Sequence, residues 1–266
     1  MSLLGTASMK EDTPSSDRFR LKPGPLMAGI FFSLALPFLS FLTVEFFKLV
    51  GLPERPQMPW LAEYYFHIIL FCYAYLAILL MKRAWPGDYG FQWPRARSYV
   101  WTALILGIAL GALTMLFDHW SELVDGRQLY QYYSRIYART PVNIAGWAAF
   151  DGVVIGVAQE TMFRGFLVGF LTHAMPGRIR IGSFSMNGAG IVAAPIYALF
   201  LLLYSARFLS EPLTVLLGQF GCACLLGIFL AYWFEKSRSL LAPIIGHNAA
   251  ALTEQALIFA MVGHWR

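Results

Sequence analysis

The sequence predicts an all-α fold, a polytopic bundle of about seven transmembrane helices. Of the 266 residues, 58% are hydrophobic and only 13% are charged, whereas roughly a quarter of the residues in an average soluble domain are charged. Seven apolar runs are also long enough to span a bilayer, because about 20 helical residues cross a hydrocarbon core of ~30 Å. Such a chain has too little polar sequence to cover the surface of a soluble protein.

The predicted spans follow one another along the chain. The fourth is too long and too polar in its second half for a simple span, so we expect it to protrude or to be kinked. Three Gly pairs with GxxxG spacing, at 107/111, 152/156 and 165/169, predict closely packed helices. The seven spans are residues 26–44, 64–81, 99–117, 142–171, 189–206, 213–234 and 240–262.

The composition outside the spans divides the chain into four parts. Residues 1–25 mix Ser, Pro, Asp and Lys, which predicts a flexible cytoplasmic tail. Residues 26–117 hold the N-terminal transmembrane helices. Residues 118–141 combine acidic residues with several Tyr and Arg, a composition typical of an amphipathic segment at the membrane surface. Residues 142–266 form the C-terminal transmembrane core.

The basic residues predict the orientation, because Lys and Arg collect in cytoplasmic loops. One side of the predicted bundle carries twelve of them, namely Lys10, Arg18, Arg20, Lys22, Lys82, Arg83, Arg95, Arg97, Arg178, Arg180, Lys236 and Arg238. The other side carries six, namely Arg55, Arg127, Arg135, Arg139, Arg207 and Arg266. The N-terminus is therefore expected in the cytoplasm, and a bacterial cytoplasmic membrane is the expected location. No dense basic run indicates a nucleic-acid partner.

The three cysteines, Cys72, Cys222 and Cys224, all fall within predicted spans. This placement favours neither a disulfide framework nor a zinc site with paired ligands. The five His residues are scattered, and no HExxH helix, GxSxG elbow or phosphate-binding Gly-rich loop is present. We therefore expect no metal and no other cofactor. A cleavable signal is not expected either, because the first apolar run starts at residue 26 and is full length.

The residues that most strongly indicate a site lie in the fourth span, where Gln159, Glu160 and Arg164 interrupt apolar sequence. Ionisable residues at membrane depth are costly and normally face a protein interior or a hydrated cavity. Glu160 and Arg164 are i,i+4 neighbours, so they can pair on one helix face. A structural ion pair and a functional site both fit this spacing, and the two interpretations have nearly even weight.

Other polar residues lie in the predicted spans. His247 follows Pro243 and Gly246, and Glu254 lies seven residues further on, nearly on the same helix face. Asp151 precedes Gln159 by more than two turns. Glu63 and His67, near the start of the second span, are expected to be solvated at the interface.

These residues resemble the signature of the CAAX prenyl protease and bacteriocin-immunity family of intramembrane proteins, also called CPBP or ABI. The resemblance has three parts in the same order and covers roughly residues 142–255. Residues 159–165, Gln-Glu-Thr-Met-Phe-Arg-Gly, are similar to the family's Glu-Glu-x-x-x-Arg element. Residues 200–204, Phe-Leu-Leu-Leu-Tyr, resemble its Phe-x-x-x-His element, and residues 239–247 resemble the approach to its last His.

The resemblance implies a bundle with a conical polar cavity between the C-terminal helices, and a glutamate-dependent endopeptidase without covalent intermediate. In the family, the first Glu and the second-element His activate a water molecule, and the last His and an Asn four residues on stabilise the oxyanion. Here those positions hold Gln159, Tyr204, His247 and Ala251. An amide cannot act as a base, and a phenol with a pKa near 10 is a poor substitute for imidazole.

Two functions remain open from the sequence. The first is a divergent endopeptidase that cleaves membrane-associated or lipidated peptides, with Glu160 as base, Arg164 as its orienting partner and His247 as oxyanion donor. Asp151 and Glu254 are possible substitute groups. The second is a catalytically degenerate family member that acts as a membrane scaffold, an accessory subunit or a binding protein for lipid or peptide. The expected partners are membrane lipids with a prenylated or other membrane peptide, or a membrane-protein complex.

Overall fold

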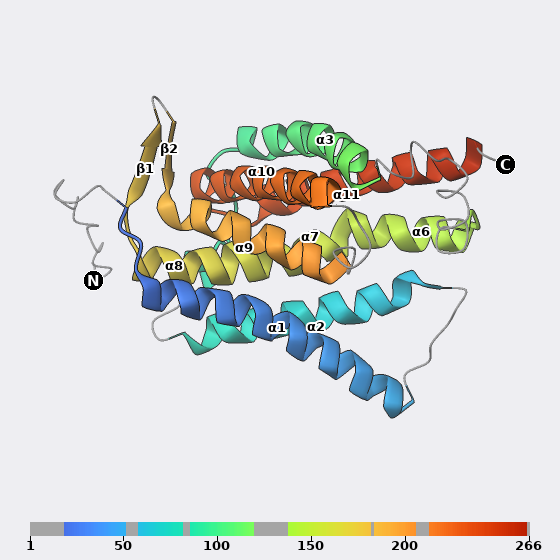
Figure 1. The fold of residues 1–266 in the computed structure, drawn as a ribbon, viewed down its shortest axis with the longest axis horizontal. Coiled ribbons are helices and arrows are strands. Elements are labelled where there is room, and N and C mark those ends of the chain that lie inside the picture. The colour runs from blue at the N-terminus through green and yellow to red at the C-terminus, as the bar shows by residue number, and fades with distance from the viewer. Residues whose placement is uncertain are drawn as a thin grey trace, which may run out of the picture.

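Long helices make up nearly all of the fold, as Figure 1 shows for a computed structural model. The structure describes residues 19–51, 58–81, 86–119, 138–181, 184–205 and 213–264. The elements are α1 (Pro23–Leu49), α2 (Trp60–Leu80), η1 (Pro86–Tyr89), α3 (Ser98–Asp118), α6 (Pro141–Ala149), η2 (Phe150–Val154), α7 (Ile155–Glu160), η3 (Thr161–Val168), α8 (Gly169–Ala174), β1 (Arg178–Ile181), β2 (Phe184–Asn187), α9 (Gly188–Ser205), α10 (Leu213–Ser237) and α11 (Leu241–His264).

Each of the seven predicted spans corresponds to a long helix or, for the fourth, to the continuous run from α6 to α8. Within the described ranges, six of these have the length and apolar character needed to cross a membrane. The remaining one, α11, has 24 residues and carries His247, Asn248, Glu254 and Gln255. The expected all-α polytopic bundle is confirmed, and the chain is an integral membrane protein.

Two apolar clusters hold the helices together. One lies between α1, α2, η3 and α9 and is centred on Leu70, Phe163 and Leu167. The other lies between α3, α10 and α11 and includes Ala103, Leu230 and Trp233. Many apolar side chains outside these clusters are exposed, among them Phe31, Phe38, Trp101 and Leu217, as expected of helices that face lipid.

The close packing predicted from GxxxG is confirmed for α3. A Cβ placed on Gly107 would lie 2.3 Å from the carbonyl oxygen of Gly246, and one on Gly111 would lie 2.2 Å from that of Ala250. Both neighbours belong to α11. Since backbone atoms cannot yield as flexible side chains can, only Gly allows α3 and α11 to approach this closely.

Some boundaries differ from the prediction. α1 starts at Pro23, three residues inside the expected tail, because Pro is well suited to the first turn of a helix. A two-stranded antiparallel hairpin, β1 with β2, occupies the expected loop between the fourth and fifth spans. Residues 1–18 and most of the expected amphipathic segment, residues 120–137, lie outside the described ranges.

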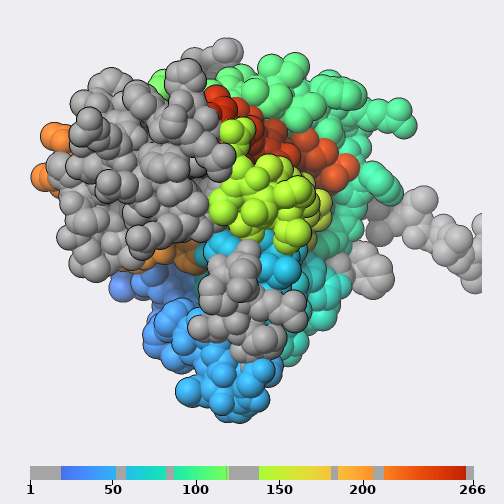
Figure 2. All heavy atoms as spheres, turned by 90° about the vertical axis from the view of Figure 1, so that its right-hand side faces the viewer, coloured from blue at the N-terminus to red at the C-terminus, as the bar shows by residue number. Residues whose placement is uncertain are grey.

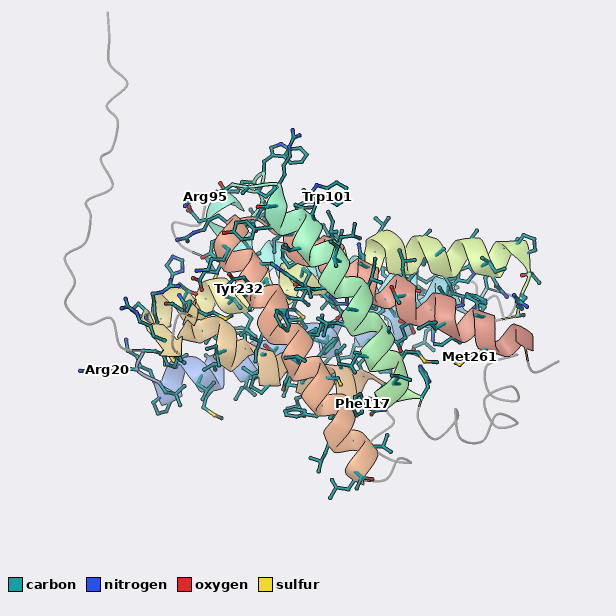
Figure 3. All side chains as sticks on the ribbon, turned by 90° about the horizontal axis from the view of Figure 1, so that it is seen from above. Arg20, Arg95, Trp101, Phe117, Tyr232 and Met261 are labelled. Carbon is teal, nitrogen blue, oxygen red and sulfur yellow. The ribbon has the colours of Figure 1, made fainter. Side chains whose placement is uncertain are left out.

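The two ends of the bundle differ. Arg20 and Arg95 lie at one end and Met261 of α11 lies at the other (Figure 3). Figure 2 looks onto the second end and shows α6 between the end of α11 and the beginning of α2.

Candidate functional site

The helical run from α6 to α8 positions the central motif and contains two π-helical stretches, η2 and η3. The amide of Ile155 donates to the carbonyl of Phe150, five residues earlier. Beside this stretch, Gly156 N donates to Asn248 Oδ1 and Asn248 Nδ2 donates to Gly152 O, each at 2.9 Å. In a regular α-helix the groups of Gly152 and Gly156 bond to each other. Asn248 of α11 therefore bonds to the backbone groups that would otherwise pair within the helix, and so stabilises the irregular stretch that precedes the motif.

Glu160 lies at the centre of a buried charged network. Its Oε1 accepts a hydrogen bond from Arg164 Nη1 at 3.0 Å and lies 2.7 Å from His247 Nδ1. Arg164 Nη2 donates to the carbonyl of Gly227 on α10 at 3.1 Å, and the guanidinium lies 4.5 Å from the ring centre of Tyr197. Glu160 is 0% exposed and Arg164 is 2% exposed. The three retained motif residues thus connect α7, η3 and α11.

His67 of α2 is bonded to Gln159, and this contact was not expected from the sequence. His67 Nδ1 lies 2.9 Å from the carbonyl oxygen of Glu63, which can only accept, so Nδ1 carries a proton. Its Nε2 lies 3.2 Å from Gln159 Nε2 and accepts from this amide as a neutral imidazole. His67 is 0% exposed, so the prediction of a solvated interfacial side chain is wrong.

Tyr204 also bonds to α2. Its hydroxyl donates to Glu63 Oε2, and its ring lies edge-on to His67 with 5.8 Å between the ring centres. Tyr204 stands where the family resemblance implies an imidazole, and the imidazole beside it comes from α2. Ala251, at the position of the expected Asn, is half-buried on α11.

A cavity of about 350 Å³ lies between α2, η2, α9, α10 and α11, and we call it the polar cavity because several ionisable side chains line it. It is lined by Glu63, His67, Asp151, Tyr197, Tyr204, His247, Ala251 and Glu254, together with His119, Gln219, Gln255 and apolar side chains. Gln159, Glu160 and Arg164 do not line it. Instead, Gln159 and Glu160 lie behind the wall, where they hold His67 and His247 respectively.

Several buried polar atoms along this wall have no hydrogen-bond partner in the described part of the chain. They are the Tyr197 hydroxyl, Asp151 Oδ2 and Gln255 Nε2. Tyr197 is 1% exposed and Asp151 is 6% exposed. Since unsatisfied buried polar groups are rare and costly, their presence at a cavity wall is typical of a ligand or water site. At the same wall, His119 Nε2 lies 3.2 Å from Glu254 Oε1.

A larger apolar groove of about 1280 Å³ adjoins the cavity. It runs between α1, α2 and α9, where Phe31, Phe38 and Leu203 contribute to its lining. Glu63, Trp147, Tyr204 and Ser205 line both spaces. The hydrogen bond from Tyr204 to Glu63 therefore stands at the boundary between the groove and the polar cavity.

The sequence interpretation missed the roles of His67, His119 and Tyr197. The i,i+4 pair of Glu63 and His67 was a usable signal, because ionisable residues inside a span face the protein interior more often than lipid. Tyr197 carried no signal of its own. In the described ranges, no three His, Cys, Asp or Glu side chains are placed to hold one metal ion.

Comparison with known families agrees with this geometry. Residues 141–253 match the family described as Rce1-like, type II CAAX prenyl endopeptidase Rce1-like. The chain has a CAAX-protease-like membrane core. The matched residues are nearly the same as residues 142–255, the range over which the three motif elements resemble that family. No curated protein and no solved structure gives a significant match. In this CAAX-protease-like core, the retained Glu160, Arg164 and His247 form one connected network beside a polar cavity.

Proposed function

We propose that the protein is an intramembrane endopeptidase with His247 as its general base. The contact between Glu160 and His247 Nδ1 carries this proposal. A carboxylate bonded to Nδ1 fixes the orientation of an imidazole and stabilises its protonated form. Because Nδ1 is engaged, Nε2 is the nitrogen that remains for a water molecule in the cavity. Arg164 in turn holds Glu160 in place.

The proposed reaction needs no group beyond the chain and water. His247 Nε2 takes a proton from water while the water oxygen bonds to the scissile carbonyl carbon. The resulting oxyanion accepts a hydrogen bond from a donor at the wall, for which the unpartnered Tyr197 hydroxyl is suited. Cleavage of the C–N bond follows, and His247 returns its proton to the leaving amine. These roles differ from those that the family resemblance implies, in which the position of Gln159 takes the proton.

The substrate class follows from the two adjoining spaces. The polar cavity can hold a peptide bond, and the apolar groove can hold a prenyl or other lipid chain attached to the same peptide. A membrane-associated or lipidated peptide is therefore the proposed substrate. We place the N-terminus on the cytoplasmic side of a bacterial cytoplasmic membrane, since Arg20 and Arg95 share one end of the bundle (Figure 3).

The test uses the purified full-length protein in mild detergent with internally quenched hydrophobic peptides, with and without a prenyl group. We expect His247→Ala to lower kcat/KM by about 10²–10⁴-fold, the range for loss of a general base. His173→Ala is the matched control, because His173 is exposed on α8 and does not line the cavity. Thermal unfolding of both variants checks that they fold. Cleavage that persists in folded His247→Ala refutes the assignment.

The degenerate-scaffold function has its own support, because Gln159, Tyr204 and Ala251 replace the groups of the family mechanism. It predicts that mild extraction yields a stable stoichiometric complex with another membrane protein or a bound lipid. Wild-type protein that cleaves none of the peptides and purifies with such a partner would favour this second function over the endopeptidase.

A further inference from the structure

The wall of the polar cavity is acidic. Glu63 of α2, Asp151 of η2 and Glu254 of α11 line it, and none of the described residues that line it is Lys or Arg. Arg164 cannot neutralise these acids directly, because its guanidinium is bonded to Glu160 and to the carbonyl of Gly227 behind the wall. Carboxylates in such surroundings are costly unless they meet a proton or an opposite charge.

The three acids differ in how far the chain itself satisfies them. Glu63 accepts from the Tyr204 hydroxyl, and Glu254 lies within hydrogen-bond distance of His119. Asp151 is 6% exposed, and its Oδ2 has no partner in the part of the chain that the structure describes. This buried, unpartnered oxygen belongs to a residue that lines the cavity, and it indicates that a donor from a ligand completes the site.

An organic cation fits this wall better than a metal ion. The acids come from three separate elements, and within the described ranges no three potential metal ligands converge on one point. A guanidinium carries several N–H donors and can bond acceptors that are spread over a wall. The rings of Trp147 and Phe150 line the same cavity and offer faces on which a cation is stabilised.

Asp151 and Glu254 also lie on one side of Glu160 and His247, the pair on which the proposed catalysis depends. Glu254 follows His247 by seven residues on α11, and Asp151 precedes Glu160 by nine residues on the neighbouring run. Both offsets lead toward the end of the bundle where α6 begins and α11 ends (Figure 1). At 1.5 Å per residue, the offset on α11 is about 10 Å, roughly the length of three residues of extended peptide.

We propose that the acidic wall of Glu63, Asp151 and Glu254 binds the side chain of an Arg or Lys within about three residues of the scissile bond in a peptide substrate. The substrate role rests on the proposed endopeptidase function, whereas binding of the cationic peptide does not require cleavage. The wall disfavours a free peptide C-terminus at the same position, because its carboxylate would face three acids, and no Lys or Arg is among the described residues that line the cavity. Specificity for an internal basic residue follows.

The experiment compares two fluorescent hydrophobic peptides that differ only in one side chain, Arg in the first and the neutral isostere citrulline in the second. Binding to the full-length protein in detergent is measured by fluorescence anisotropy at fixed salt concentration. We expect the wild-type protein to bind the Arg peptide at least tenfold more tightly. Asp151→Asn should reduce this ratio to below about threefold, and Glu254→Gln should reduce it independently. Asp88→Asn, an exposed acid in η1, should leave it unchanged.

Each outcome separates this inference from the proposed function. Equal affinity of the wild-type protein for the two peptides, or binding of neither, refutes the inference. A ratio that stays at the wild-type value in both folded cavity variants also refutes it. Preferential binding of the Arg peptide without cleavage supports the acidic wall and counts against the endopeptidase. Cleavage of both peptides at equal rates and with equal affinities supports the endopeptidase and refutes the role of the acidic wall.

Discussion

Replacement of Arg164 by Met tests whether the buried network supports the fold around the site. The substitution keeps a long flexible side chain but removes the donors to Glu160 Oε1 and to the carbonyl of Gly227. Glu160, which is 0% exposed, would keep the His247 imidazole as its remaining bonded partner. We therefore expect a large loss of stability, because a buried carboxylate is left without its guanidinium.

The magnitude follows from the burial of both partners. Removing one member of a buried ion pair typically costs about 3–5 kcal/mol, and much of this is the penalty of the charge left behind. The unpaired carbonyl of Gly227 and the lost contact with the Tyr197 ring belong to the same network, so their costs do not simply add. We expect the free energy of unfolding of Arg164→Met to fall by about 3–5 kcal/mol.

The double variant Glu160→Gln/Arg164→Met separates the charge penalty from the loss of packing. With both charges removed, the amide at position 160 can still accept from His247, and a neutral network costs far less to bury. We expect the double variant to be at least about 2 kcal/mol more stable than Arg164→Met alone. Arg95→Met is the control, because Arg95 is exposed and the substitution keeps its backbone amide, which donates to the carbonyl of Ser237.

The assay is unfolding by SDS titration in mixed micelles, followed by Trp fluorescence, with the control expected within about 0.5 kcal/mol of wild type. Two results would refute the reasoning. One is an Arg164→Met variant within about 1 kcal/mol of wild type, far below the cost of an uncompensated buried charge. The other is a double variant no more stable than the single one.

Two Gly positions give further predictions in the same titration. A Cβ on Gly156 would lie 2.1 Å from Asn248 Oδ1 and 3.0 Å from the carbonyl oxygen of Ile244, so Gly156→Ala should cost about 2–3 kcal/mol, mainly through the lost Asn248 bonds. Because Asn248→Ala removes the nearer obstacle, fully additive costs in the double variant would contradict this cause. A Cβ on Gly111 would lie 2.2 Å from the backbone oxygen of Ala250, so Gly111→Ala should cost about 1–3 kcal/mol. Gly221→Ala, with no atom within 4 Å of the new Cβ, should be neutral or up to about 1 kcal/mol stabilising, and equal effects at 111 and 221 would contradict the packing argument.

The sequence predicts the spans well because each depends on a local property, the apolar character of about 20 consecutive residues. The helices differ from the predicted runs mainly at their ends, where capping and turn chemistry decide the last residues, as Pro23 does for α1. The hairpin of β1 and β2 was missed, because its strands have only four residues each and lie between two spans.

The site is predictable only where its parts are close in sequence or belong to a family motif. Glu160 and Arg164 pair as their i,i+4 spacing indicates. The bond between Gln159 and His67 joins residues 92 positions apart, and it depends on the packing of α2 against α7. The two hydrogen bonds of Asn248 with Gly152 and Gly156 likewise require a π-helical stretch, and the existence of this stretch depends on tertiary contacts.

Adjacent residues on a helix point in directions about 100° apart, and this explains how the altered motif fits the observed contacts. Gln159 faces α2 and Glu160 faces α11. His67 carries its proton on Nδ1, so the lone pair on Nε2 faces position 159. An ionised carboxylate there would meet that lone pair, whereas the amide of Gln159 donates a hydrogen bond to it. Gln159 and His67 are therefore complementary. The position that holds the first Glu of the family motif keeps a hydrogen-bonded polar side chain here, and its partner is His67 of α2.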